Sequence, residues 1–249
     1  MKKKFAIAAI FLITYLGFLI ATLPSTVVLQ QIFLPKKLVL SGVNGTLWQT
    51  NIEQLTIDDI SIEQVSMQLS FWSLFTLTPK LDISFGDPLL SGPEGKLMLS
   101  ISSQEATITD LSILVKANEV AQQLTLPLPL SAKGDVELMM SAASVNLQDN
   151  QCLTAKGDVN WSKASVVALE QNIKLGSLSA DISCEDGALA LMLSPKNDLG
   201  VTFTAYVRQG SRISGSGYLK PGAKFPQALN DALPFLGKKD NQGRYRLGF

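Results

Sequence analysis

The distribution of hydrophobic and polar residues divides this chain into two parts. The first is an uncharged, mainly apolar stretch at the N-terminus, and in the second apolar and polar residues alternate. Nineteen consecutive residues, Phe5 to Leu23, carry no charge, and three lysines stand directly before them. A helix rises about 1.5 Å per residue, so this stretch would be about 28 Å long, close to the roughly 30 Å hydrocarbon core of a bilayer. The pattern therefore predicts a transmembrane helix over residues 5–23.

The flanks of this stretch indicate how it would sit in a membrane. Signal-peptide apolar regions are about 7–15 residues long and end in small residues, whereas this one is longer and ends in Thr22-Leu23, so we interpret it as an uncleaved anchor. The N-terminal lysines favour a cytoplasmic side for residues 1–4 and place the rest of the chain across the membrane. Residues 24–40 are expected to form a membrane-proximal helix and linker. The residues that we single out for the anchor are Phe5, Phe11, Tyr15, Phe18 and Leu23.

From Leu38 onward the apolar residues recur with a period of two, which is typical of strands with one buried face. Runs such as 65–71, 81–85 and 97–101 alternate in this way, and Gly, Asn and Pro separate them. Short helices are expected at 116–124 and 226–233. We predict a mainly β domain over 41–249, an antiparallel meander that is either sandwich-like or groove-like. Two sub-sheets could meet near 125–131.

Composition narrows the chemistry that this domain can perform. The chain has no histidine, which excludes a Ser-His-Asp triad, a Cys-His dyad and an imidazole metal site built from this chain alone. Without the three N-terminal lysines, 18 basic and 21 acidic residues remain, a net charge of −3, which argues against nucleic acid as a partner. No spacing of carboxylates or glycines indicates a cofactor site. We predict that the protein is not an enzyme and holds no cofactor or metal.

Cys152 and Cys184 are the two cysteines of the chain, and they do not form a C-x-x-C motif. In an exported domain, an isolated pair is typical of one structural disulfide, which would contribute about 3–4 kcal/mol in the chain-entropy model. The alternative is two buried free thiols. The pairing stays open at this point, with the disulfide as the expectation.

Three aromatic residues gather in a short apolar segment, Phe71-Trp72-Ser73-Leu74-Phe75. Such a cluster is too apolar for an unprotected surface. Phe71, Trp72 and Phe75 are therefore either part of the core or a candidate interface.

Several short motifs, in order along the chain, resemble those of one bacterial family. They are Ser41-Gly42-Val43-Asn44-Gly45-Thr46-Leu47-Trp48, Phe71-Trp72-Ser73-Leu74, Cys184-Glu185-Asp186-Gly187, Leu233-Pro234-Phe235-Leu236-Gly237 and Gly243-Arg244-Tyr245-Arg246. Over essentially the whole chain, the sequence resembles the protein N family of the bacterial type II secretion system, and the Gly-Thr-Leu-Trp element is the most specific part of the likeness. The glycine that this family usually carries soon after the tryptophan is not obvious in Gln49-Thr50-Asn51.

The resemblance implies a single-pass protein of the bacterial inner membrane, with its N-terminus in the cytoplasm and its bulk in the periplasm. It also implies an accessory role in the export of folded proteins across the outer membrane, through contacts with other secretion components, and no enzymatic activity. An alternative function is a membrane-tethered β-groove that binds lipid, since one-sided sheets of this kind also resemble lipid-handling proteins. An open apolar face lined by Val65, Met67, Leu69, Leu81 and Ile83 would favour that alternative.

Overall fold

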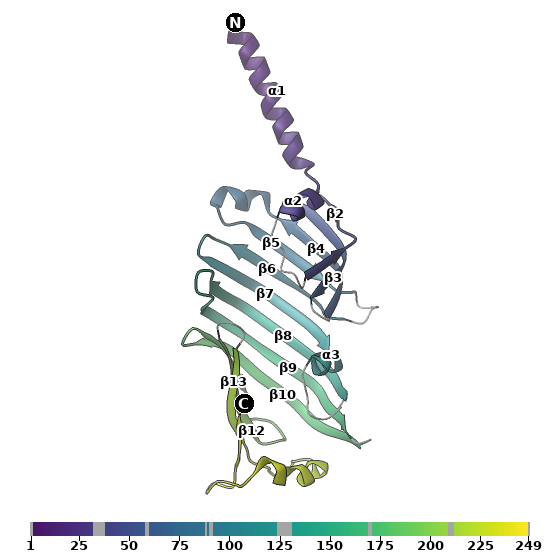
Figure 1. Ribbon diagram of the computed structural model, residues 1–249, viewed down its shortest axis with the longest axis vertical. Coiled ribbons are helices and arrows are strands. Elements are labelled where there is room, and N and C mark those ends of the chain that lie inside the picture. The colour runs from purple at the N-terminus through teal and green to yellow at the C-terminus, as the bar shows by residue number, and fades with distance from the viewer. Residues whose placement is uncertain are drawn as a thin grey trace.

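One antiparallel sheet makes up most of the folded chain, and a long helix leads into it at one end (Figure 1). The structure is a computed structural model that describes residues 2–31, 38–57, 60–87, 89, 92–123, 131–168, 171–208 and 212–248. The helices are α1 (Lys2–Ala21), α2 (Ser25–Gln31), the 3₁₀ helix η1 (Phe71–Thr76), α3 (Ala117–Gln122) and the 3₁₀ helix η3 (Gln227–Leu236). The strands are β1 (Leu38–Ser41), β2 (Asn44–Gly45), β3 (Gln49–Ile57), β4 (Ile60–Leu69), β5 (Lys80–Phe85), β6 (Glu94–Ile101), β7 (Glu105–Lys116), β8 (Ser131–Asn146), β9 (Cys152–Ala168), β10 (Gln171–Glu185), β11 (Ala188–Leu193), β12 (Val201–Arg208), β13 (Arg212–Leu219) and β14 (Tyr245–Gly248).

The strands are arranged in the sheet in the order in which they occur in the sequence. Within the described residues the order runs from β1 to β3 and then through each successive strand to β14, and the short β2 pairs beside β3. Every neighbouring pair is antiparallel. The structure confirms the predicted antiparallel meander, which is an open sheet. The sandwich-like alternative is wrong, because no second sheet occurs among the described strands.

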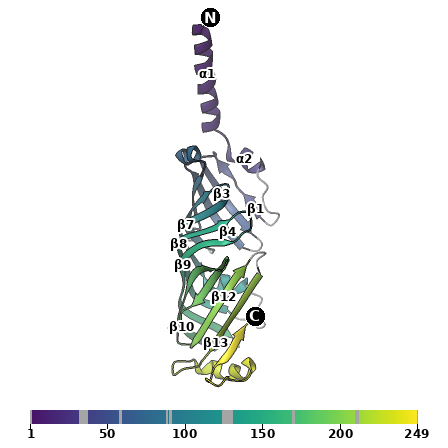
Figure 2. The same ribbon diagram turned by 90° about the vertical axis from the view of Figure 1, so that its left-hand side faces the viewer.

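The four longest strands, β7 to β10, form the middle of the sheet, and local irregularities bend them. The register shifts between β6 and β7 beside Asp110, and between β8 and β9 beside Lys163; both residues have positive φ angles, of 51° and 50°. Such β-bulges increase the local twist and curvature of a sheet. Figure 2 shows the result, with β12 and β13 turned away from the plane of the central strands.

The apolar side chains on one face of the sheet are buried mainly by packing against one another. Leu111, Met140 and Ile182 lie at the centre of an apolar cluster, and each is less than a tenth exposed. The residues packed around them come from the same face of strands β6 to β11, namely Leu97, Ile108, Ile113, Leu138, Ala143, Ala155, Val159 and Leu189. Alternation of apolar and polar residues therefore fills a curved apolar face without a second layer among these residues.

The face on which the lipid alternative depends is partly covered. Val65 is buried, whereas Met67, Leu69, Leu81 and Ile83 are half-buried. This part of the apolar face is therefore neither a sealed core nor fully open to solvent.

The short helices lie near their predicted places, with one correction. The expected helix at 116–124 is α3, and that at 226–233 is the 3₁₀ helix η3. The alternation predicted to run from Val65 to Phe71 stops at Leu69, and η1 begins at Phe71. The chain turns here because the Ser73 hydroxyl donates to the Ser70 carbonyl oxygen at 2.6 Å and accepts from the Lys80 N–H at 2.9 Å, which closes the segment as a loop.

The suggested boundary between two sub-sheets falls on residues 124–130, which lie outside the described residues, and on Ser131, the first residue of β8. On either side of that segment, β7 and β8 pair from Glu105 with Asn146 to Lys116 with Asp135. The sheet is therefore continuous across this point in the sequence.

Candidate interaction surfaces

The residues predicted for the membrane anchor all lie on or directly after α1. Phe5, Phe11, Tyr15 and Phe18 are exposed, and Leu23 is half-buried beside the sheet. Within the part of the chain that the structure describes, no helix has the length and apolarity needed to cross a membrane.

Hydrogen bonds attach the end of α1 to the sheet. The indole Nε1 of Trp48 donates to the Ile20 carbonyl oxygen at 3.1 Å, and the Leu47 N–H donates to the Leu23 carbonyl oxygen at 2.9 Å. Both acceptors lie near the C-terminal end of the helix, where carbonyl groups lack partners within the helix. The Gly-Thr-Leu-Trp element thus holds the start of the domain against the end of α1.

Beside this junction, five apolar side chains of η1 and its C-terminal end lie exposed together. We call Phe71, Trp72, Leu74, Phe75 and Leu77 the aromatic patch; Trp72, Phe75 and Leu77 are 76%, 70% and 84% exposed. The ring of Phe71 lies 5.2 Å from that of Trp48 and 5.3 Å from that of Phe75, measured between centroids. The structure therefore brings the predicted Phe71, Trp72 and Phe75 together at the surface, in contact with the residue that attaches α1.

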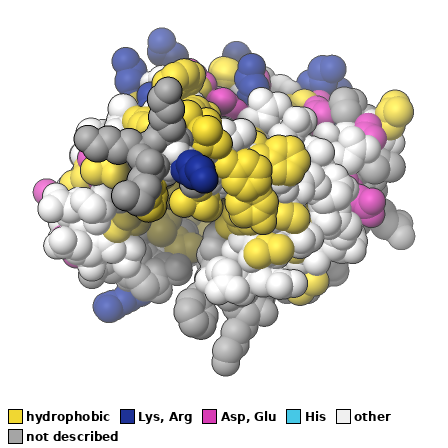
Figure 3. Space-filling view, turned by 90° about the horizontal axis from the view of Figure 1, so that it is seen from above, with side chains coloured by type: hydrophobic (Ala, Val, Ile, Leu, Met, Phe, Trp, Pro, Cys, Tyr) yellow, Lys and Arg dark blue, Asp and Glu magenta, His cyan; other side chains and the backbone are white. Residues whose placement is uncertain are grey.

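The space-filling view from the α1 end shows where hydrophobic and charged side chains lie around α1 (Figure 3). Hydrophobic side chains gather at the centre of this view, and most Lys, Arg, Asp and Glu side chains lie toward its margin. A hollow opens beside the centre, with more hydrophobic side chains in its depth. This end of the molecule is apolar at its centre and polar at its rim.

The two cysteines form the expected disulfide. Cys152 begins β9 and Cys184 lies near the end of β10, with their Cα atoms 5.7 Å apart. The Cys152 N–H also donates to the Gly187 carbonyl oxygen at 2.9 Å. The bridge therefore joins the turn between β8 and β9 to the turn between β10 and β11.

A depression of about 750 Å³ lies across β4 to β8, and its lining includes polar residues as well as Leu97, Leu111 and Met140 of the apolar cluster. Ser66, Ser84, Lys96, Ser112 and Met139 are paired in register across five strands and line it. Its acidic lining residues are Asp82 and Asp110. Among the described residues no group of three or more Cys, Asp or Glu side chains could hold a metal ion. The depression offers hydroxyl and charged groups but no arrangement that indicates catalysis.

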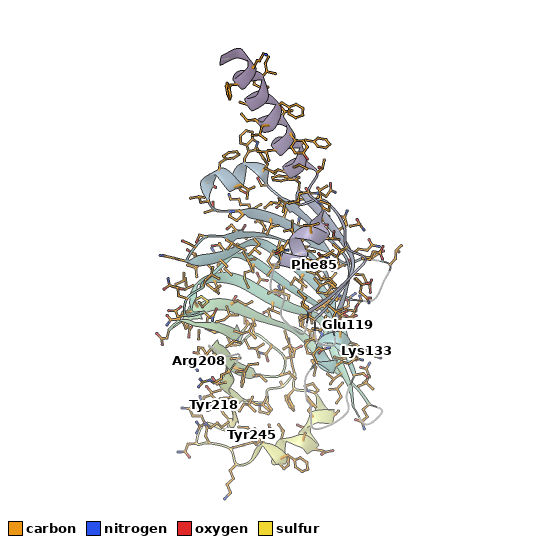
Figure 4. All side chains as sticks on the ribbon, turned by 45° about the horizontal axis from the view of Figure 1, so that its top comes forward. Phe85, Glu119, Lys133, Arg208, Tyr218 and Tyr245 are labelled. Atoms are coloured by element: carbon orange, nitrogen blue, oxygen red, sulfur yellow. A yellow bond between two sulfur atoms is a disulfide. The ribbon has the colours of Figure 1, made fainter. Side chains whose placement is uncertain are left out.

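The final strands carry a concentration of positive charge. All four arginines of the chain, Arg208, Arg212, Arg244 and Arg246, belong to residues 201–249, which hold eight basic and two acidic side chains, a net charge of +6. Residues 5–200 hold ten basic and nineteen acidic side chains, a net charge of −9. Figure 4 shows Arg208, Tyr218 and Tyr245 at the end of the sheet away from α1. We call residues 201–249 the basic end.

Three of the four arginines of the basic end have no acidic partner among the described residues. Arg208 and Arg212 lie directly opposite each other on β12 and β13, and like charges in that position repel. Among the described residues no carboxylate lies within 4.0 Å of the Arg208, Arg212 or Arg246 guanidinium, whereas Arg244 pairs with Asp240 at 2.8 Å and stacks 4.0 Å over the Tyr218 ring. Among the residues that the structure describes, these three guanidinium groups therefore have no carboxylate partner, although Arg208 donates to the Ser214 hydroxyl at 3.1 Å.

Two further groups outside α1 have pKa values shifted by hydrogen bonds. The Tyr206 hydroxyl donates to Glu185 at 2.9 Å, which raises the pKa of Tyr206, and burial adds to the shift. Lys116 donates to Asp135 at 2.6 Å, which raises the pKa of Lys116. Both shifts favour the protonated form that makes the bond. The Lys116 bond joins the neighbouring strands β7 and β8, and the Tyr206 bond joins β12 to the end of β10 across β11.

The sequence profile described as "Type II secretion system (T2SS), protein N" matches residues 36–248. The chain belongs to this family. A type II secretion system protein N of Aeromonas hydrophila is 32% identical over 254 residues, covering 100% of this chain and 98% of the relative. Proteins of the same name from Vibrio cholerae and Klebsiella pneumoniae are 26% and 27% identical, each covering 98% of this chain and 97% and 94% of the relative. No solved structure matches the chain.

Membership of the type II secretion system protein N family makes the chain a component of that secretion system. Sequence reasoning missed one surface of this family member, the basic end. The sequence does contain a pattern that indicates the basic end, because every arginine lies within the last 42 residues, from Arg208 onward. The overall charge near zero concealed it, since the excess of acidic side chains earlier in the chain balances the basic end.

Proposed function

We propose that this chain is an accessory component of the type II secretion apparatus that acts through protein contacts of its β domain. In this proposal residues 5–23 span the bacterial inner membrane, residues 1–4 lie in the cytoplasm, and residues 41–249 lie in the periplasm. The uncharged N-terminal stretch supports the anchor, and the three lysines support its orientation. The disulfide supports a periplasmic location for residues 41–249, since structural disulfides persist in oxidising compartments.

The observation that carries the proposed contact is the free edge of the sheet in the basic end. Strand β14 pairs with β13 alone among the described strands, so its other edge presents unpaired backbone groups. An added strand from a partner can pair with such an edge, and side chains on it then set specificity. Because Arg246 points from β14 and has no acidic partner among the described residues, the proposed partner segment is extended and acidic.

Site-specific photo-crosslinking in secreting cells tests this contact. A photoreactive residue in place of Arg246 is expected to form adducts with other secretion components. The matched control replaces Gln104, which is also exposed but lies in the turn between β6 and β7. Equal adducts from both positions, or no adduct from position 246 together with unchanged export of folded proteins after gene deletion, would contradict the proposal.

The lipid-binding alternative is favoured by one specific observation, a cavity on the apolar face. About 520 Å³ of space lies between α3 and the sheet, lined in part by Ile60, Pro93, Ile113, Val115 and Val120. Mostly apolar cavities of roughly 300–1,000 Å³ are typical ligand sites, and an acyl chain fits the apolar lining.

Mass spectrometry of lipids that copurify with the full chain separates this alternative from the first. If lipid occupies the cavity, Val115→Arg should remove it, because a charged side chain would enter the apolar lining. Met139→Arg, on the polar face, should leave lipid bound. Absence of copurifying lipid from the unmodified protein would contradict the lipid-binding function.

A further inference from the structure

The aromatic patch differs from an ordinary surface loop in how little polar surface it offers. Residues 70–79 contain no charge, and the first charged residue after η1 is Lys80. Contiguous exposed apolar surface of this kind marks a binding site for a partner or a membrane. The location of the patch favours a membrane over a protein partner, because the patch contacts Trp48, whose indole is bonded to the end of α1.

Several polar groups of the η1 loop are hydrogen-bonded within the loop itself. Ser73 is buried and bonds to both ends of the loop, at the Ser70 carbonyl and the Lys80 N–H. The Thr76 hydroxyl donates to the Ser73 carbonyl oxygen at 2.8 Å, and the Leu77 N–H donates to the Leu74 carbonyl oxygen at 3.3 Å. Backbone groups that are already bonded cost less to remove from water, so this loop can enter an apolar region.

Leu77 is held in a conformation that a leucine rarely adopts. Its φ of 56° lies in the left-handed region, where helix ends favour Gly or Asn. Even so, its side chain is 84% exposed, so nothing in the described domain compensates for the strain by packing. A leucine in this conformation with its side chain in solvent supports a contact outside the domain that receives the side chain.

From these observations we infer that the aromatic patch inserts into the interfacial layer of the same bilayer that α1 enters, as a second membrane attachment point. This inference rests on the proposed membrane anchor. Aromatic rings are enriched at the headgroup level of membrane proteins, and Phe71 of the patch contacts both Trp72 and Trp48, whose indole is bonded to the end of α1. With α1 and the patch both in the membrane, the domain cannot rotate freely about the helix. The cavity between α3 and the sheet and the basic end then keep a defined direction relative to the membrane.

The native disulfide makes a direct test practical, because both natural cysteines are paired and a new cysteine can be labelled alone. Full-length Phe75→Cys is labelled with an environment-sensitive fluorophore and reconstituted into vesicles of phosphatidylethanolamine and phosphatidylglycerol. Nitroxide groups placed near the headgroups should reduce its emission roughly twofold, because interfacial side chains lie about 5–10 Å into the headgroup region. Phe235→Cys, at a site that is 91% exposed in η3, is the matched control and should not respond.

A third label distinguishes failure of this inference from failure of the anchor. A fluorophore at Phe11→Cys should be quenched most by nitroxides deep in the acyl chains. Quenching at position 11 but not at 75 would overturn the second attachment and leave the anchor intact. Quenching at neither position would overturn both. If position 75 is instead shielded only when other secretion components are added, the patch is a protein-docking site and the membrane inference is wrong.

Discussion

Removing the disulfide is the perturbation whose effect the structure defines most directly. Cys152 and Cys184 are separated by 32 positions, so the bridge closes a loop that spans β9 and nearly all of β10. In the chain-entropy model, a loop of this size restricts the unfolded chain by about 4 kcal/mol at 25 °C. Strands β9 and β10 remain paired along their length without it, so the folded sheet should persist while the unfolding free energy falls by about that amount.

Chemical unfolding in urea measures this loss. The double variant Cys152→Ser and Cys184→Ser should unfold at a lower urea concentration than the oxidised protein, as followed by tryptophan fluorescence. Reduced wild-type protein is the matched control and should unfold with the variant. The reasoning fails if oxidised and reduced protein unfold together, or if the protein isolated from its own membrane carries two free thiols. The second result would also remove one support for the periplasmic location.

Two further predictions concern the last strands. Gly217→Ala should lower the unfolding free energy by about 1–3 kcal/mol, because a Cβ there would clash with the Thr202 carbonyl oxygen. Gly222→Ala, which has open space around it, should unfold like wild type. Arg244 donates a backbone and a side-chain hydrogen bond to Asp240 and holds the pKa of that carboxyl below its usual 3.8. That stabilisation is present above the usual pKa and is lost as pH falls through the lowered one. The melting-temperature advantage of wild type over Asp240→Asn should therefore shrink in acid, and a constant difference would contradict this.

The alternation of apolar and polar residues predicted the strands and their antiparallel pairing well. A period of two assigns side chains to the two faces of a strand regardless of how the sheet curves or packs. It could not distinguish a sandwich from an open sheet, since each requires one apolar face per strand. Leu111 and Met140 are cross-strand partners on adjacent strands, but the local register of β6 and β7 depends on a bulge at Asp110, where a non-glycine residue takes a positive φ. Sequence patterns carry little signal for such positions.

The aromatic patch shows the other limit of sequence reasoning. The apolar segment was recognisable, but a continued alternation made Phe71 look like the end of a strand. A serine side chain decides otherwise, because Ser73 bonds across the loop and closes it. The position of the patch beside α1 depends on the Trp48 contact with Phe71, which joins residues far apart in the sequence. Only the tertiary structure therefore distinguishes a core cluster from an exposed surface.

In this fold, order in the sequence becomes order in space. Each strand from β4 to β13 pairs with its predecessor and its successor, so the described strands follow one another across the sheet from the α1 end (Figure 1). A gradient in composition along the sequence is therefore a gradient along the molecule. The aromatic patch lies early and beside α1, whereas the net charge of +6 in residues 201–249 lies at the other end of the sheet. Because oppositely charged surfaces attract over about 10 Å at ordinary salt, the basic end can select an acidic partner without affecting the attachment at α1.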